Sequence, residues 1–428
     1  MEIYVVRAGD TVYSIADMFG VTAERIIQNN GLLNPEKLVV GQTLVIQIPR
    51  TVHIVKAGDT LYSIARMYGK TVIQLLQNNP YLILNRELQI GEEVVIDYEG
   101  EKIGNVRVNG YAYPFINTSV LQMALPYLTT VTVFGYGFDT EGELYPPRVN
   151  DDEVIRLAYD YSAAPIMLIS SMDANGVFNS YIASEVFRNE AAQDNLIDNI
   201  LSTMKQKGYV GLDVDFEFIE PDDRLVYQEF LRNVTARLNV EGYTVNVDLA
   251  PKVSADQPGL LYEAHDYEAI GGIADTVLLM TYEWGYMYSE PKAVAPIPEV
   301  RRVLDFGVSV IEPKKIYMGV PNYGYDWNLP YVKGTAATVI GNDEAVRIAA
   351  QNNASIQFDE RAQSPYFNYT DQFGRQHEVW FEDARSIDAK LRLINEYGLL
   401  GAGYWNIMRP FDQNRLVLNG IYNIEKIV

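Results

Sequence analysis

The chain has 428 residues and no cysteine, and its 56 acidic residues against 34 basic ones give a formal net charge of −22. The length allows two or three domains with a large core, and the missing cysteines exclude a disulfide framework, thiolate zinc sites and cysteine nucleophiles. The negative charge disfavours nucleic acid and anionic membranes as partners, so we expect a ligand that is neutral or bound despite its charge.

The first residues, "MEIYVVRAGDT", lack the basic and apolar regions of a signal peptide, and no run of 18 apolar residues occurs anywhere in the chain. We therefore expect a protein that is made without a signal peptide and does not insert into a membrane. The three histidines, His53, His265 and His377, lie far apart, and none has a second histidine at metal-ligand spacing. We expect no metal site.

An internal repeat covers the N-terminal part of the chain. "YVVRAGDTVYSIADMFG" at residues 4–20 matches "HIVKAGDTLYSIARMYG" at an offset of 49 residues. The repeat predicts two tandem modules, residues 2–48 and 51–97, each with the order strand, helix, helix, strand. Asp10 and Asp59 precede the first helix of each module, and we expect them to be its N-caps.

This pattern resembles the LysM family, and the match covers both modules nearly end to end. The resemblance implies a two-stranded sheet backed by two helices, and binding of N-acetylglucosamine-containing glycans such as peptidoglycan or chitin. It places the glycan groove at Gly9, Asp10, Thr11 and Asn30 to Leu32 in module one, and at Gly58, Asp59, Thr60 and Asn79 to Leu82 in module two. The alternative, that Asp and Thr here only cap helices, stays open. Two copies would increase retention on a polymer.

After a polar linker at residues 98–105, strand-like runs alternate with helical stretches such as 193–208 and 222–239. This alternation predicts a (β/α)₈ TIM barrel over residues 104–428, with a doubly wound open sheet as the alternative. The segment 327–375, between the last two strands, is the candidate for an insertion that walls the cleft. We expect deletion of residues 1–98 to leave turnover of short soluble fragments largely intact but to reduce retention on insoluble sacculi. The eight runs lie at 106–115, 128–138, 165–172, 209–218, 243–252, 274–284, 315–325 and 400–407.

One of these strands, "YVGLDVDFEFIEP" at residues 209–221, alternates apolar and acidic residues. Alone, such a strand could be an edge strand facing water, but both faces of a barrel strand are covered. Leu212, Val214, Phe216 and Phe218 are therefore predicted to point outward under helices. The acids Asp213, Asp215 and Glu217 are predicted to point inward, with Glu217 at the catalytic mouth.

Three inward carboxylates are costly unless they are protonated, paired or hydrogen-bonded, so their presence predicts catalysis. Crowded carboxylates cannot all ionise, because a nearby like charge disfavours the charged form. Asp215 could thereby keep a proton on Glu217 near neutral pH, as a general acid that protonates a glycosidic oxygen requires.

The segment "GLDVDFE" resembles the D-G-x-D-x-D-x-E signature of family 18 glycoside hydrolases, with Val210 in place of the first Asp. We expect this loss, at the deepest position of the barrel, to weaken the buried acid network. "MTYE" at 280–283 resembles the family's M-x-Y-D, with Glu283 in place of Asp. The resemblance assigns Tyr282 to the substrate acetamide and Trp405 to the floor of the sugar subsite. Tyr323, Glu283, Tyr111 and Asn322 complete the predicted substrate-binding residues.

The resemblance implies a retaining, substrate-assisted mechanism that needs no cofactor: the 2-acetamido oxygen attacks the anomeric carbon, Glu217 is the general acid and base, and Asp213, Asp215 and Tyr282 assist. The whole chain resembles the spore cortex-lytic N-acetylglucosaminidases of endospore-forming bacteria. We therefore expect a monomeric hydrolase that degrades spore-cortex peptidoglycan or its fragments at the boundary of coat and cortex. Two alternatives stay open: a chitinase acting on chitin oligomers, and a non-catalytic glycan-binding spore coat protein.

Overall fold

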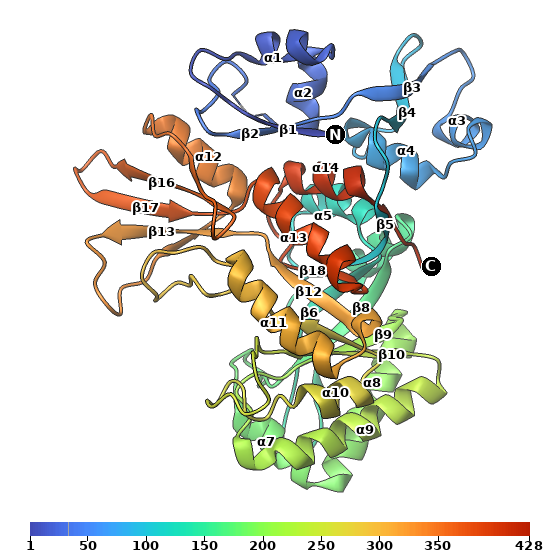
Figure 1. Cartoon of the computed structure of the whole chain (residues 1–428). Coiled ribbons are helices and arrows are strands. Elements are labelled where there is room, and N and C mark those ends of the chain that lie inside the picture. Colours follow the sequence, from blue (N-terminus) through green and yellow to red (C-terminus); the bar gives the residue numbers. More distant parts are fainter. Residues whose placement is uncertain (33) are drawn as a thin grey trace.

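The computed structural model describes residues 1–32 and 34–428. A barrel forms its centre, the two N-terminal modules cover one side of the barrel, and a small sheet with one helix projects beside them (Figure 1). Within the described residues, no helix is both long and apolar enough to span a bilayer.

Both N-terminal modules have the predicted order of elements. In module one, β1 (Glu2–Val5) pairs antiparallel with β2 (Thr43–Ile46), and α1 (Val12–Phe19) and α2 (Ala23–Asn29) lie between them in the chain. Module two repeats this arrangement, with β3 paired antiparallel with β4. Its elements are β3 (Pro49–Ile54), α3 (Leu61–Met67), α4 (Val72–Asn78), the short η1 (Pro80–Leu82) and β4 (Glu93–Tyr98).

The expected N-caps, Asp10 and Asp59, were wrong by one residue. Thr11 is the N-cap of α1 and forms a capping box with Ser14, and Thr60 does the same for α3. Asp10 instead accepts hydrogen bonds from the Arg7 amide and the Tyr4 hydroxyl, both at 2.7 Å. The aspartate thus closes the loop that precedes the helix, and the threonine next to it satisfies the free helical amides.

Eight parallel strands close into the predicted barrel, because β5 pairs with both β6 and β18. Going round the barrel, the strands are β5 (Gly104–Ala112), β6 (Thr130–Phe138), β8 (Ala164–Ser170), β9 (Gly211–Asp215), β10 (Thr244–Leu249), β11 (Thr276–Leu279), β12 (Ile316–Pro321) and β18 (Gly401–Trp405). The short β7 (Leu144–Tyr145) pairs antiparallel with β6, and the short β19 (Tyr422–Ile424) pairs parallel with β5. The doubly wound alternative is therefore excluded.

Helices that follow the strands cover the outside of the barrel (Figure 1). They are α5 (Thr118–Ala124), α6 (Asp152–Asp160), α7 (Ser180–Arg188), α8 (Glu190–Lys207), α9 (Arg224–Val240), α10 (Tyr267–Ile273), α11 (Ile297–Val310), α13 (Ala384–Tyr397) and α14 (Asp412–Ile421), with 3₁₀ turns η2 (Leu125–Tyr127), η3 (Pro221–Asp223) and η4 (Pro313–Lys315). Apolar strand residues such as Leu212 and Val214 are fully buried beneath them. Burying such a side chain contributes about 1.5–3 kcal/mol.

An insertion separates β12 from β18, as the sequence predicted. It forms an antiparallel sheet in the order β14-β13-β17-β16-β15, with α12 (Asn342–Gln351) beside it. Its strands are β13 (Gly324–Leu329), β14 (Thr338–Ile340), β15 (Gln357–Asp359), β16 (Ser364–Thr370) and β17 (Gln376–Trp380). Tyr325 and Trp327 of β13 are buried, so the insertion is anchored at its base.

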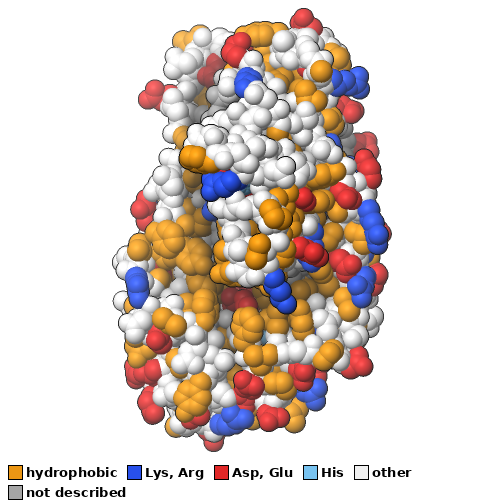
Figure 2. Space-filling view, turned by 90° about the vertical axis from the view of Figure 1, so that its left-hand side faces the viewer, with side chains coloured by type: hydrophobic (Ala, Val, Ile, Leu, Met, Phe, Trp, Pro, Cys, Tyr) orange, Lys and Arg blue, Asp and Glu red, His pale blue; other side chains and the backbone are white. Residues whose placement is uncertain are grey.

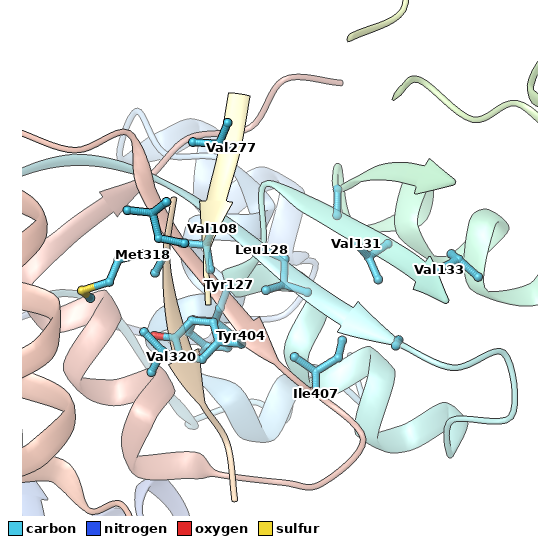
Figure 3. Close-up of a cluster of buried hydrophobic side chains, with 14 of the residues drawn as sticks. Val108, Tyr127, Leu128, Val131, Val133, Val277, Met318, Val320, Tyr404 and Ile407 are labelled. Atoms are coloured by element: carbon cyan, nitrogen blue, oxygen red, sulfur yellow. The ribbon is translucent and has the colours of Figure 1, made fainter. Parts of the chain in front are cut away.

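Module two shares one hydrophobic core with the barrel. Its Gln77 donates to the carbonyl of Pro126 at 2.7 Å, and the Tyr127 hydroxyl donates to the carbonyl of Gln77 at 2.9 Å. Tyr127 packs with barrel residues such as Val108 and Leu128 in the cluster of Figure 3. Module two is thus packed against the barrel, and residues 98–105 connect two parts that share an interface.

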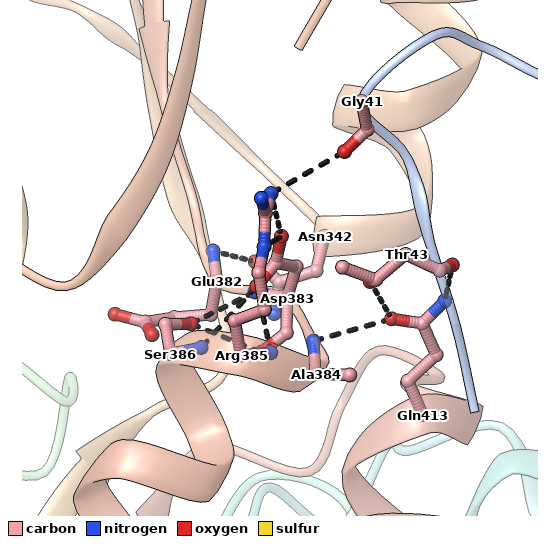
Figure 4. A network of polar contacts seen from close by, with 9 residues as sticks. All are labelled: Gly41, Thr43, Asn342, Glu382, Asp383, Ala384, Arg385, Ser386 and Gln413. Carbon is pink, nitrogen blue, oxygen red and sulfur yellow. Dashed lines mark hydrogen bonds and ion pairs between the residues drawn. The ribbon is translucent and has the colours of Figure 1, made fainter. Parts of the chain in front are cut away.

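Module one docks on the insertion and on the ends of α13 and α14. The Thr43 hydroxyl bonds to Gln413 at 2.7 Å, and Arg385 donates to the carbonyl of Gly41 at 3.3 Å (Figure 4). Val39, which is 5% exposed, completes the core of the insertion with residues such as Phe367. Removal of residues 1–98 would therefore uncover two apolar cores. The effect of this deletion on turnover and retention stays a prediction.

Candidate active site

The acidic strand β9 places its carboxylates as the alternation predicted. Asp213 and Asp215 are 1% and 7% exposed, and Glu217, two residues beyond the strand end, is partly exposed at the barrel mouth. Phe216 packs outward against Phe230. The outward position predicted for Phe218 was wrong, because the strand has ended there: Phe218 is 50% exposed and has a φ of +55°.

A polar network fixes Asp213 inside the barrel. The Asn246 amide donates to Asp213 at 2.8 Å and to Asp248 at 3.0 Å, and the Tyr111 hydroxyl donates to Asp248 at 2.8 Å. Asp248 on β10 was not among the predicted site residues. The signal was there, because "TVNVDL" alternates apolar and polar residues as β9 does, with Asn246 and Asp248 on its inward face.

These buried carboxyl groups hold protons more tightly than exposed ones. Burial raises the pKa of Asp213 to about 6, while hydrogen bonds such as that from Asn246 oppose the rise. Burial, together with the neighbouring charges of Glu217 and Asp213, raises the pKa of Asp215 well above its usual range. These shifts favour the protonated form of the buried carboxyl groups. The expectation that Asp215 keeps a proton on Glu217 does not match their causes, because burial and Glu283 raise the pKa of Glu217, whereas the charge of Glu217 raises that of Asp215.

Val210 does not occupy the deepest position of this acid network. It precedes β9, its amide donates to the carbonyl of Pro165 at 3.0 Å, and its side chain is partly exposed. The expectation that Val210 weakens the network was therefore wrong, because it assumed that position 210 belongs to the network. The buried carboxyl groups lie higher, on β9 and β10.

Glu283 closes the mouth beside Glu217. It has a φ of +69°, and its carboxylate accepts hydrogen bonds from the hydroxyl groups of Tyr323 and of Tyr325, the latter at 3.0 Å. Burial raises the pKa of Glu217, and the charge of Glu283 raises it further. Tyr282 is buried, and burial followed by the charges of Asp248, Asp215, Glu217 and Glu283 raises the pKa of its hydroxyl. The hydroxyl of Tyr282 thus lies among the carboxylates.

An aromatic wall leads out from Trp405, which is itself partly exposed. The rings of Tyr111 and Phe134 each lie 5.7 Å from that of Trp405, and Tyr113 stacks on Phe115 at 5.2 Å. Phe115 is 64% exposed. Figure 2 shows one face of the molecule with a hollow that is bordered by hydrophobic side chains and has acidic side chains within it. Sugar rings present apolar faces and polar edges that suit such a surface.

Asn322 is the predicted site residue that the structure does not bring to the carboxylates. Its amide donates to the carbonyls of Asn406 and Arg409 at 2.9 and 3.0 Å, and so it holds the loop that follows Trp405. Its role in binding substrate stays a prediction. Within the described part of the chain, no cluster of three or more His, Cys, Asp or Glu residues has the geometry to hold a metal ion.

In the modules, the predicted groove residues divide into two kinds. Gly9 and Gly58 are exposed, with φ values of +90° and +91°, and a Cβ on either would meet no atom within 4 Å, so a ligand can approach the backbone there. Asn30 and Asn79 are instead buried. The Asn30 amide donates to the carbonyls of Ile26 and Val45 and accepts from the amide of Val45, which joins α2 to β2.

Comparison with known proteins agrees with this geometry. The model of glycosyl hydrolases family 18 matches residues 172–409, and the LysM domain model matches residues 4–47 and 53–97. The chain is 42% identical to the cortical fragment-lytic enzyme of Bacillus subtilis (strain 168), over 100% of this chain and 99% of that one. The crystal structure of the Bacillus megaterium QM B1551 spore cortex-lytic enzyme SleL matches with a TM-score of 0.84 and 38% identity, over 100% and 99% of the two chains. A chitinase from Chromobacterium violaceum shares the fold, with a TM-score of 0.69, 24% identity and coverage of 74% and 98%.

Proposed function

Because the chain belongs to the glycosyl hydrolases of family 18 and carries two LysM domains, we propose that it is an N-acetylglucosaminidase acting on spore-cortex peptidoglycan or its fragments. The chain is a glycoside hydrolase, and its relatives named for cortical fragments and for the spore cortex align over its full length. The observation that carries the proposal is the partly exposed Glu217 above two buried inward carboxyls, beside Tyr282 and in the same mouth as Trp405.

Glu217 acts first as the general acid. Its raised pKa favours the protonated carboxyl group, and this proton passes to the glycosidic oxygen as the bond to the anomeric carbon breaks. The 2-acetamido oxygen of the sugar attacks that carbon, so the substrate replaces a protein nucleophile. Glu217, now a carboxylate, then takes a proton from water, which opens the cyclic intermediate with retention of configuration.

Asp215 and Tyr282 orient the acetamido group during this attack. One oxygen of Asp215 is buried and has no hydrogen-bond partner in the described residues, so it is free to accept from the acetamido nitrogen. The Tyr282 hydroxyl lies near Asp215 and Glu217, where it can donate to the acetamido oxygen. Glu283, Tyr323 and Tyr111 hold the surrounding wall, and Trp405 supports the sugar ring.

The aromatic wall and the modules both favour a polymeric glycan. Phe115 and Phe178 are 64% and 63% exposed, and each adjoins Trp405 through one intervening ring. We assign the modules to residues 2–48 and 51–97 and the catalytic barrel to residues 104–428. The loops of Gly9, Asp10 and Thr11 and of Gly58, Asp59 and Thr60 bind the N-acetylglucosamine units. The enzyme acts as a monomer at the spore cortex.

Digestion of two substrates tests this proposal. Wild-type protein is incubated with purified cortical peptidoglycan fragments and, separately, with chitin oligomers, and the new reducing ends are measured. The proposal predicts turnover of the cortical fragments, with products that end in reducing N-acetylglucosamine. Strong turnover of chitin oligomers with none of cortical fragments would instead identify a chitinase.

A further inference from the structure

Asp248 is on β10, the strand next to β9, which carries Asp213 and Asp215. In the parallel pairing of β10 with β9, Asn246 lies opposite Asp213 and Val247 opposite Val214. Asp248 therefore lies level with Asp215, on the same inward face, and it is 4% exposed. A third carboxyl group is thus sealed beneath the mouth.

No basic group compensates these three carboxyl groups among the described residues that face them. The groups that face Asp248 are the carboxyls of Asp213 and Asp215 on β9, the hydroxyl of Tyr111 on β5 and the amide of Asn246 on its own strand. The hydroxyl groups of Tyr282, after β11, and of Tyr227, on α9, complete the surroundings. Three buried charges without a cation would be prohibitively costly, so the cluster retains protons.

The hydrogen bonds indicate which carboxyl holds a proton. Oδ1 of Asp248 accepts hydrogen bonds from both Tyr111 and Asn246. Both donors therefore use the same oxygen, and the second oxygen of Asp248 can carry a proton. Asp213 accepts from the same Asn246 nitrogen, at 2.8 Å, so the shared amide holds the two carboxyl groups next to each other. A proton on the second oxygen of Asp248, donated to Asp213, satisfies both carboxyls at once.

We propose that Asp248 is a neutral positioning residue whose proton is donated to Asp213, so that Asp213 stays ionised and fixed beneath Asp215. Asp248 touches no substrate and acts through Asp213. Burial and the charge of Glu217 raise the pKa of Asp215, and a charge held on Asp213 raises it further, since a like charge nearby disfavours ionisation. Asp215 is then released from the network and remains available to the acetamido group.

This inference rests on the proposed function, and three variants of the full chain test it. Asp248→Asn is neutral, accepts from Tyr111 and Asn246 with its oxygen, and can donate to Asp213 with its nitrogen. Asp248→Ala removes the donor. Thr130→Ala is the control, because Thr130 is buried in the same barrel interior but its hydroxyl bonds to Asn109, at 2.8 Å, and not to the carboxyl cluster. The readouts are kcat, KM and the pH profile of kcat on cortical fragments, with thermal unfolding of each variant.

The inference predicts that Asp248→Asn keeps kcat within about 3-fold of wild type, with an unchanged pH profile. Asp248→Ala is expected to lower kcat by roughly 10- to 100-fold at unchanged KM, since small displacements of a reacting group cost about this much. Thr130→Ala should retain kcat.

Two results would overturn the inference. An Asp248→Asn variant that folds normally but loses activity or shifts its pH profile would show that an ionised Asp248 is needed. A kcat equal to that of the wild type in Asp248→Ala would show that Asp248 does not position Asp213. If Asp248→Ala does not fold, Asp248→Asn alone decides. Inactive wild-type protein would count against the proposed function, and the role of Asp248 would fall with it.

Discussion

Gly41 and Gly91 offer a matched test of how firmly module one is docked. They occupy equivalent places ahead of β2 and β4, with φ values of +86° and +90°. A Cβ on Gly41 would lie 1.8 Å from the carbonyl oxygen of Ile356, whereas a Cβ on Gly91 would meet no atom within 4 Å. Alanine at either position carries the same backbone strain, and only Gly41→Ala also forces the module away from the insertion.

The magnitudes follow from the contacts that are lost. Left-handed backbone costs an alanine about 1 kcal/mol, which is the whole effect expected for Gly91→Ala. At Gly41, the hydrogen bond from the Ile356 amide to the carbonyl of Val40, 2.9 Å long, is also lost, at about 1 kcal/mol. Exposing the buried Val39 adds about 1.5–3 kcal/mol. We therefore expect Gly41→Ala to destabilise the docked state by about 4 kcal/mol.

Urea unfolding and hydrogen exchange measure this difference. Gly41→Ala should increase exchange in the insertion around Val379 and Phe381, which share a core with Val39, and Gly91→Ala should not. Equal stability and equal exchange in the two variants would refute the claim that module one completes the core of the insertion.

Three further changes probe the site and its supports. Glu283→Gln removes a charge that raises the pKa of Glu217, so the basic limb of the kcat/KM pH profile should move to lower pH; an unmoved limb would contradict the coupling. Burial lowers the pKa of His265 to about 4, so the unfolded chain binds one more proton than the folded chain between about pH 6.5 and 4. The stability of the fold therefore decreases as the pH is lowered through that window. His265→Gln should remove about 3 kcal/mol of this pH dependence in urea titrations, and an unchanged slope would show that His265 does not cause it. Phe115→Ala should raise KM for long glycans by roughly 5- to 10-fold while sparing short fragments. Phe373→Ala, 72% exposed on the turn between β16 and β17, is its control, and equal effects would contradict the role of the wall.

The repeats, the barrel and Glu217 could be predicted because each depends on a periodic pattern in the chain. The family resemblance and the predicted hydrolase class are confirmed by the matches to family 18 and LysM models and to full-length relatives. The alternation of β9 placed Asp213, Asp215 and Glu217 because a strand has only two faces. The same pattern failed at Phe218, where the strand had ended and the left-handed backbone leaves the side chain half exposed instead of packed under helices.

Other features depend on contacts between distant segments. Asp248 was missed because one acid in a strand gives a weak pattern. Its importance comes from its place beside Asp213 and Asp215 of the neighbouring strand, which only the folded sheet shows. The docking of module one depends on Val39 and Gly41, whose neighbours lie more than 300 residues away in the insertion. The buried Asn30 and Asn79 were predicted as ligand-binding residues, and the structure shows that their side-chain amides hold each module together. Their glycan contact stays a prediction.

The central claim is that Glu217 is the acid that cleaves N-acetylglucosaminyl bonds of cortical peptidoglycan. The most direct test digests cortical fragments with wild-type and Glu217→Gln protein, and identifies the products and their reducing-end sugars by mass spectrometry. General acid catalysis contributes about 10²- to 10⁴-fold, so the variant should bind the fragments but release product at least about 100 times more slowly. Wild-type products should end in reducing N-acetylglucosamine. Equal rates, or products ending in the other cortical sugar, would contradict the account.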